Sequence, residues 1–153
     1  MASEFVSFML VFGLGISMVV GITVSMQNIS QSVFETSAEV GLEKVIDKLS
    51  GSIIDGVNYE HQWQGNISYE LNLNLARLIV NKYAYQLSVT LTNGTYYLVG
   101  QTIDTTTSVS YSQSLSLNLH DVSIIGTISS TSSNAYILFT KSSAGTVVIL
   151  GNR

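Results

Sequence analysis

The sequence predicts an α+β protein in which a long N-terminal hydrophobic helix, the stalk, precedes an antiparallel β-sandwich-like head domain. Three observations support this class. Residues 5–27 carry no charge, apolar residues within 38–53 recur at the spacing of one helix face, and polar and apolar residues alternate from residue 67 onward. The predicted division is a helical segment, 1–55, and a β domain, 56–153.

Segment 5–27 is long enough to cross a lipid bilayer. As a helix it extends roughly 33 Å at 1.5 Å per residue, and the hydrocarbon core of a bilayer is about 30 Å thick. A cleaved secretory signal has a basic start, a shorter apolar stretch and a small-residue cleavage site. Because the start of this chain shows none of these features, we expect the helix to be retained as a transmembrane segment.

Small residues recur at every fourth position of this segment, at Gly13, Ser17, Gly21 and Ser25. Lipid tails are as apolar as leucine, so helices associate in membranes through close backbone packing at small residues. Glycine is also common in membrane helices that only anchor a protein. Two interpretations stay open: a helix-packing seam, which we favour, and a plain anchor.

The helix is expected to continue past the membrane to about residue 54. One face is apolar and has to be covered by another part of the protein, whereas the opposite face is acidic and is expected in water. The apolar face consists of Ala38, Leu42, Val45, Ile46, Leu49 and Ile53. The acidic face consists of Glu35, Glu39, Glu43 and Asp47. Asp55-Gly56 is the expected end, because glycine is common just after a helix.

The rest of the chain alternates polar and apolar residues, which predicts roughly six to eight β-strands. The candidate strands lie within 69–75, 83–91, 96–103, 109–119, 122–128, 136–140 and 146–150. Asn93-Gly94 stands between two of these runs and predicts a hairpin, because both residues tolerate positive φ. Short polar connections of this kind favour an antiparallel sandwich or an open barrel.

Composition excludes several classes of function. The net charge is −4, and the six Lys and Arg residues form no cluster, so a nucleic-acid partner is not expected. The chain has no cysteine, which removes thiolate chemistry, disulfides and the common zinc sites.

No catalytic residue, metal site or cofactor is expected. In His120-Asp121 the two side chains would point to opposite faces of a strand, so they cannot form a triad-like hydrogen bond. Glu60-His61 has no further ligand at metal-binding spacing, and no phosphate-binding or nucleophile motif occurs. Trp63 and the tyrosine pairs are expected to pack in the sheet rather than to form a sugar platform. An enzyme is therefore not expected.

Three N-x-[ST] sequons start at Asn28, Asn66 and Asn93. These asparagines are candidate N-glycosylation sites, and glycosylation would place everything after the apolar segment outside the cytoplasm. We therefore expect a membrane-anchored chain with an extracytoplasmic β domain.

An uncharged helix with one early acid, Glu4 in MASEFVSFMLVFGLGISMVVG, leads into an amphipathic stalk and a small β domain. This arrangement resembles the archaeal type IV pilin-like superfamily, which includes archaeal pilins, archaellins and the archaellum accessory proteins called F and G. The likeness covers the whole chain in layout but only the helical segment in motif. The start SEF…MLVFG also suits the G-type accessory protein.

The resemblance implies that the apolar helices bundle into a filament core while the β domains face outward. It implies that Gly13, Ser17, Gly21 and Ser25 form a helix–helix seam, and that Glu4 meets the N-terminal amine of a neighbouring subunit, since an isolated carboxylate in hydrocarbon is costly. The partners would be the membrane and further pilin-like subunits in a homo-oligomer or filament.

Two structural roles on the archaeal cell surface stay equally open. One is a subunit of a pilus-like filament. The other is an archaellum accessory protein that links the motor to the surface layer and so serves motility, with its β domain in the pseudo-periplasm. An alternative of another class is a membrane-anchored adhesin or surface-layer binding module that does not polymerise.

Overall fold

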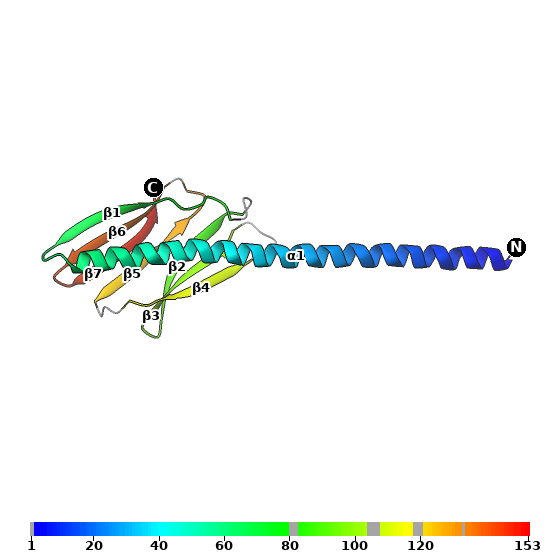
Figure 1. Ribbon diagram of the computed structural model, residues 1–153, viewed down its shortest axis with the longest axis horizontal. Helices are drawn as coiled ribbons and strands as arrows, with labels where there is room; N and C mark the ends of the chain where they lie inside the picture. Colours follow the sequence, from blue (N-terminus) through cyan, green and yellow to red (C-terminus); the bar gives the residue numbers. More distant parts are fainter. Residues whose placement is uncertain (1, 80–82, 104–107, 118–120, 133) are drawn as a thin grey trace. The chain divides into compact units, whose positions relative to one another are not determined.

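The computed structural model describes residues 2–79, 83–103, 108–117, 121–132 and 134–153. One long helix, α1 (Ala2–His61), precedes seven strands (Figure 1). The strands are β1 (Ile67–Leu73), β2 (Tyr85–Thr92), β3 (Thr95–Thr102), β4 (Ser110–Leu115), β5 (Val122–Ser129), β6 (Ala135–Ser142) and β7 (Gly145–Asn152). The predicted α+β fold, with a long apolar N-terminal helix before a mostly antiparallel sheet, is confirmed.

The chain forms two compact units, Met1–Thr36 and Ser37–Arg153, which we call the N-terminal unit and the sheet unit. The N-terminal unit consists only of helix. The sheet unit contains the remainder of α1, from residue 37 to residue 61, together with all seven strands. The amphipathic half of the predicted stalk therefore folds with the sheet.

The strands form a single sheet in the order β1-β6-β7-β5-β2-β3-β4. All neighbouring pairs are antiparallel except β5 and β7, which run parallel. β6 follows β5 in the chain but pairs with β1 and β7, so β7 returns beside β5 in the same direction. The sheet thus joins a β1–β6–β7 half and a β2–β3–β4 half through β5.

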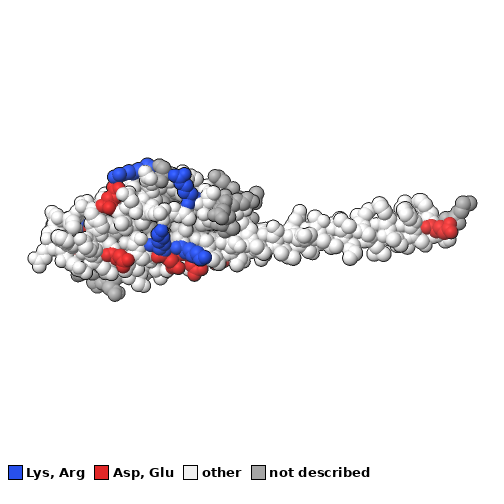
Figure 2. Space-filling model, turned by 45° about the horizontal axis from the view of Figure 1, so that its top comes forward, with Lys and Arg blue, Asp and Glu red and all other residues white. Residues whose placement is uncertain are grey.

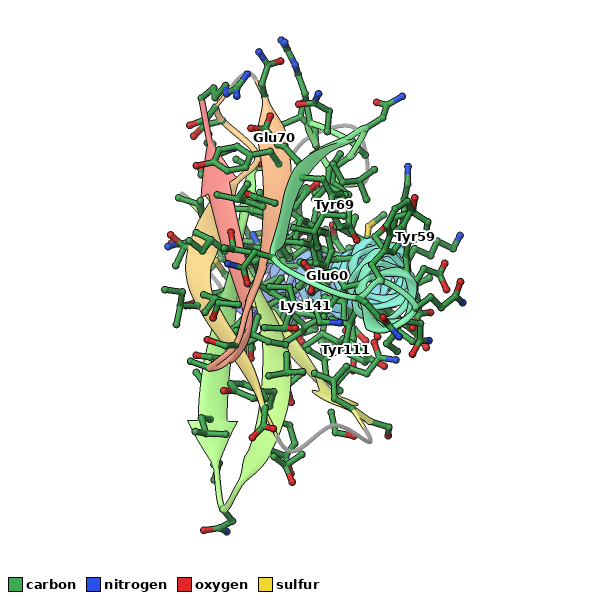
Figure 3. The ribbon with its side chains drawn as sticks, turned by 90° about the vertical axis from the view of Figure 1, so that its left-hand side faces the viewer. Tyr59, Glu60, Tyr69, Glu70, Tyr111 and Lys141 are labelled. Atoms are coloured by element: carbon green, nitrogen blue, oxygen red, sulfur yellow. The ribbon has the colours of Figure 1, made fainter. Side chains whose placement is uncertain are left out.

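The second half of α1 covers one face of this sheet (Figure 3). The whole predicted apolar face of residues 38–53 is buried, each side chain being 7% exposed or less. Apolar residues of the sheet are buried as well, among them Leu87, Leu98, Ile128, Ile137, Phe139 and Val148. A Cβ atom at Gly100 of β3 would lie 3.0 Å from Ile46 and 3.1 Å from Leu42, so this helix face packs closely on the sheet. Fully burying one such side chain contributes about 1.5–3 kcal/mol. In a sandwich a second sheet would cover this face of the sheet, whereas here the second half of α1 covers it.

The helix does not end at Asp55-Gly56 as expected but continues to His61. Gly56 is helical, and its role is close packing: a Cβ atom at this position would lie 2.1 Å from Cζ of Phe139. The end of the helix is capped instead by Lys141 of β6, whose Nζ donates to the carbonyl oxygens of Glu60 at 2.9 Å and Trp63 at 2.8 Å. The Glu60 carbonyl oxygen also accepts the Trp63 backbone amide at 3.1 Å, so Lys141 adds a second bond there and joins the helix end to β6.

The β2–β3 hairpin turns at Asn93-Gly94, as predicted. Both residues have positive φ, 51° and 79°, and Thr92 pairs with Thr95 across the turn. These values fit the two-residue turn that matches the twist of antiparallel strands.

Several predicted strands were too long. Leu75 lies beyond β1, and Leu117 lies beyond β4. Tyr83 precedes β2 and forms an isolated bridge with Ile79. Leu119 and His120 lie outside the described residues.

Candidate functional site

The N-terminal unit is an apolar helix whose side chains are exposed in the single chain. Among the described residues, one helix is long and apolar enough to cross a membrane, and none of its most apolar window is buried. Leu14 and Met18 are 70% and 69% exposed, respectively. The acidic residues of this unit are Glu4 and Glu35, near its two ends, and the helix between them is uncharged, as the long white stretch in Figure 2 shows. A helix of this length and apolar character is compatible with anchoring in a membrane.

The small-residue stripe of this helix has its polar groups paired internally. The Ser17 hydroxyl donates to the carbonyl oxygen of Gly13, and the Ser25 hydroxyl donates to that of Gly21, both at 2.9 Å. No atom lies within 4 Å of the place where a Cβ would stand at Gly13 or Gly21. Both hydroxyl groups of the stripe therefore have an acceptor within their own helix. Because its side chains are small, the backbone of another helix could approach closely along the stripe.

Glu4 lies in the first turn of α1. The exposed amide groups of that turn favour a negative charge, so the helix itself accounts for an acid at this position. Its predicted pairing with the amine of a neighbouring subunit stays a prediction.

The three sequon asparagines are all exposed. Asn28 lies within α1, Asn66 lies in the connection before β1, and Asn93 lies in the β2–β3 turn. The structure therefore leaves each of them accessible, and glycosylation itself stays a prediction.

Sequence reasoning missed a buried carboxyl group at the end of the helix (Figure 3). Glu60 is 0% exposed, and neither of its carboxyl oxygens has a hydrogen-bond partner among the described residues. Burial raises the pKa of Glu60, and the nearby Thr146 hydroxyl and Lys141 ammonium oppose that shift. Since Lys141 donates to backbone carbonyl groups instead, the site favours a neutral carboxyl group.

Aromatic rings surround this helix end. Tyr69 of β1 stacks on Phe139 with a centroid distance of 4.8 Å and meets Tyr59 edge-on at 5.8 Å. Its hydroxyl donates to the carbonyl oxygen of Gly56 at 2.7 Å. Burial, together with the nearby Glu60 and Tyr59, raises the pKa of Tyr69 to about 12. These contacts hold the end of the helix against β1 and β6.

The sequence did contain a signal for the burial of Glu60. Ile53, Val57 and Glu60 continue the spacing of four and three residues of the apolar face, and all three are buried. Because the helix was predicted to end at Gly56, the apolar face was not extended to Val57 and Glu60.

The described residues contain no group of three His, Cys, Asp or Glu side chains that could hold a metal ion. His120 of the His120-Asp121 pair lies outside the described residues, and Asp121 is exposed in the turn before β5. Besides burial, the groups that act on the pKa of Glu60 are the Thr146 hydroxyl and the Lys141 ammonium, and no second acid is among them.

Comparisons with protein-family models, with curated proteins and with solved structures found no match to this chain.

Proposed function

We propose that this chain is a structural subunit of an archaeal type IV pilus-like filament or of the archaellum machinery. It assembles through the apolar N-terminal helix and presents the sheet unit outside the membrane. A filament subunit and an accessory protein that anchors the motor to the surface layer both fit this proposal.

The observation that carries the proposal is the small-residue stripe. Gly13 and Gly21 leave space along one line of the helix, and the hydroxyl groups of Ser17 and Ser25 are already bonded to their own backbone. A plain anchor needs only apolar character, which any of the large residues provides. A stripe of small residues whose hydroxyl groups are already hydrogen-bonded instead favours close contact between helices.

A leucine scan at two glycines tests the proposal. No atom of the single chain lies within 4 Å of a Cβ at Gly21 or at Gly15, so leucine fits at both positions in an isolated subunit. Gly15 lies roughly 140° around the helix from the middle of the stripe, at about 100° per residue. Gly21→Leu should abolish assembly into sheared surface filaments, whereas Gly15→Leu should assemble like the unchanged chain.

The unfolding transition of the sheet unit serves as the control and should be the same in both variants. Normal filaments from Gly21→Leu would contradict the seam.

Cysteine cross-linking gives a second test in lipid vesicles. The chain has no cysteine, so Ser17→Cys introduces a single thiol on the stripe. Val19→Cys places one roughly 180° from the middle of the stripe. Oxidation should give disulfide dimers from Ser17→Cys and none from Val19→Cys. Equal yields would indicate random encounters of anchored chains.

The alternative is an anchored binding module that does not polymerise. The feature that favours it is a polar cavity in the sheet unit, described below. This alternative predicts that the full-length chain is dispersed as single copies in lipid and that both glycine variants behave alike.

A further inference from the structure

A cavity of about 350 Å³ lies at one end of the sheet. It is open to solvent and is lined by the end of β1, the segment 74–77, the start of β2, the end of β5 and the start of β6. Its polar lining includes Asn72, Asn74, Arg77, Ser129, Ser130, Ser132 and Asn134. The volume lies at the small end of the range found for ligand pockets, which suits a ligand of the size of one sugar ring.

The walls of this cavity are fixed by hydrogen bonds within the sheet unit. The Tyr85 hydroxyl donates to the carbonyl oxygen of Ala76, and the Tyr85 backbone amide donates to the Ser130 hydroxyl at 2.8 Å. The Asn152 side chain binds both the amide and the carbonyl group of Ser129, at 2.7 and 3.1 Å. These bonds fix the walls of the cavity, whereas the side chains of Asn72, Arg77 and Asn134 are exposed and would be ordered when a ligand binds.

Four other polar side chains of the lining form no hydrogen bond and no ion pair with the described residues. They belong to Asn72, Arg77, Ser132 and Asn134. Arg153, in contrast, is paired with Glu70 at 2.6 Å. Amide and hydroxyl groups both donate and accept, as the hydroxyl groups of a sugar do.

Arg77 is the one charged residue of the lining. Its guanidinium group can bind a carboxylate through two parallel hydrogen bonds. A single arginine balances a single negative charge, which suits a carboxylate better than a phosphate. Leu73 and Ile128, also in the lining, offer apolar surface to ring carbons.

We infer that this cavity binds a hydroxylated carboxylate of the size of one sugar, of the uronic acid class, with Arg77 on the carboxylate. Such a group occurs as a free sugar or as the end of a glycan. The site lies wholly within the sheet unit, so it does not depend on assembly of the N-terminal helix.

Calorimetric titration of the full-length chain in detergent micelles with glucuronate tests this inference. Binding should saturate. Glucose, which lacks the carboxylate, and acetate, which lacks the hydroxyl groups, should each bind about tenfold more weakly or worse, because each loses the hydrogen bonds of the group that it lacks. Methyl glucuronide, in which the methyl group takes the place of the rest of a glycan, distinguishes a glycan end from the free sugar as the ligand. Retained binding indicates a glycan end, and lost binding indicates the free sugar.

Two variants locate the site. Arg77→Gln should weaken glucuronate binding about tenfold or more, and Asn134→Asp should weaken it by repulsion of the carboxylate. Lys44→Gln, which removes an exposed cation from α1, is the matched control and should bind like the unchanged chain.

Absence of saturable glucuronate binding would overturn the inference, as would unchanged binding by both cavity variants. The Gly21→Leu variant should bind glucuronate normally whether or not it assembles. A failure to bind glucuronate is therefore distinguishable from a failure of the proposed function in assembly.

Discussion

The two units use the same helix in opposite ways. Leu14 in the N-terminal unit is 70% exposed, whereas Leu42 in the sheet unit is 0% exposed. Both residues are leucines within α1, so local helix propensity does not distinguish them. The sheet unit covers its apolar helix face with its own strands, and the N-terminal unit contains nothing that could cover its helix. The comparison shows that the sheet unit buries its apolar helix face under its own strands, whereas the N-terminal unit leaves its apolar side chains exposed in the single chain.

Truncation of matched leucines should show the largest difference between the units. Leu42→Ala leaves a cavity in the core and should lower the free energy of unfolding of the sheet unit by about 2–5 kcal/mol. Leu14→Ala should change it by less than about 0.5 kcal/mol. Urea unfolding in detergent, followed through the fluorescence of the single tryptophan, Trp63, measures both. Equal losses would mean that the N-terminal unit contributes to the core of the sheet unit.

Two glycines of α1 within the sheet unit allow a finer test of helix burial. At Gly56 an alanine Cβ would overlap the Phe139 ring, whereas at Gly51 it would meet no atom within 4 Å. Gly56→Ala should destabilise the sheet unit by about 1–3 kcal/mol. Gly51→Ala should stabilise it by about 0.5–1 kcal/mol, because alanine is the better helix former. The same unfolding assay gives both values, and a stabilising Gly56→Ala would contradict the close contact with Phe139.

The buried carboxyl group should make the stability of the sheet unit depend on pH. The pKa of Glu60 in the fold is raised above its ordinary value of 4.5. Stability from this group is therefore fully present below 4.5 and is lost as pH rises through the raised pKa. Glu60→Gln, which is always neutral, should remove this loss and be the more stable chain at neutral pH.

Unfolding measured at a series of pH values from about 4 upward follows the expected loss of stability, because that stability is fully present below the ordinary carboxyl pKa. Asp55→Asn is the control, because Asp55 is exposed on the same helix, and it should keep the pH dependence of the unchanged chain. A Glu60→Gln variant with the same pH dependence as the unchanged chain would rule out the buried group as its source.

Local sequence patterns predicted the structural elements that residues close together in the sequence determine. The apolar face from Ala38 to Ile53 is buried as its spacing required, and Asn93-Gly94 forms the expected turn. Both depend on side chains close together in the sequence, so periodicity and turn propensity contain the necessary information.

Features that depend on distant residues escaped prediction. The helix continues through Gly56, where the ring of Phe139, far along the chain, packs closely on it. The parallel pairing of β5 with β7 follows from the position of β6 beside β1. No property of a single strand fixes that order, because it depends on which pairings bury the most apolar surface together.

The sequence by itself determined a long helix with an uncharged first half, an amphipathic second half and a hairpin at Asn93-Gly94, because short-range geometry and hydrophobic spacing decide these features. Only the tertiary structure decided that Glu60 is buried, that Lys141 caps the helix, and that Arg77 and Asn134 line one cavity. Those residues come together through strand pairing and packing over long distances in the chain, which no local pattern encodes.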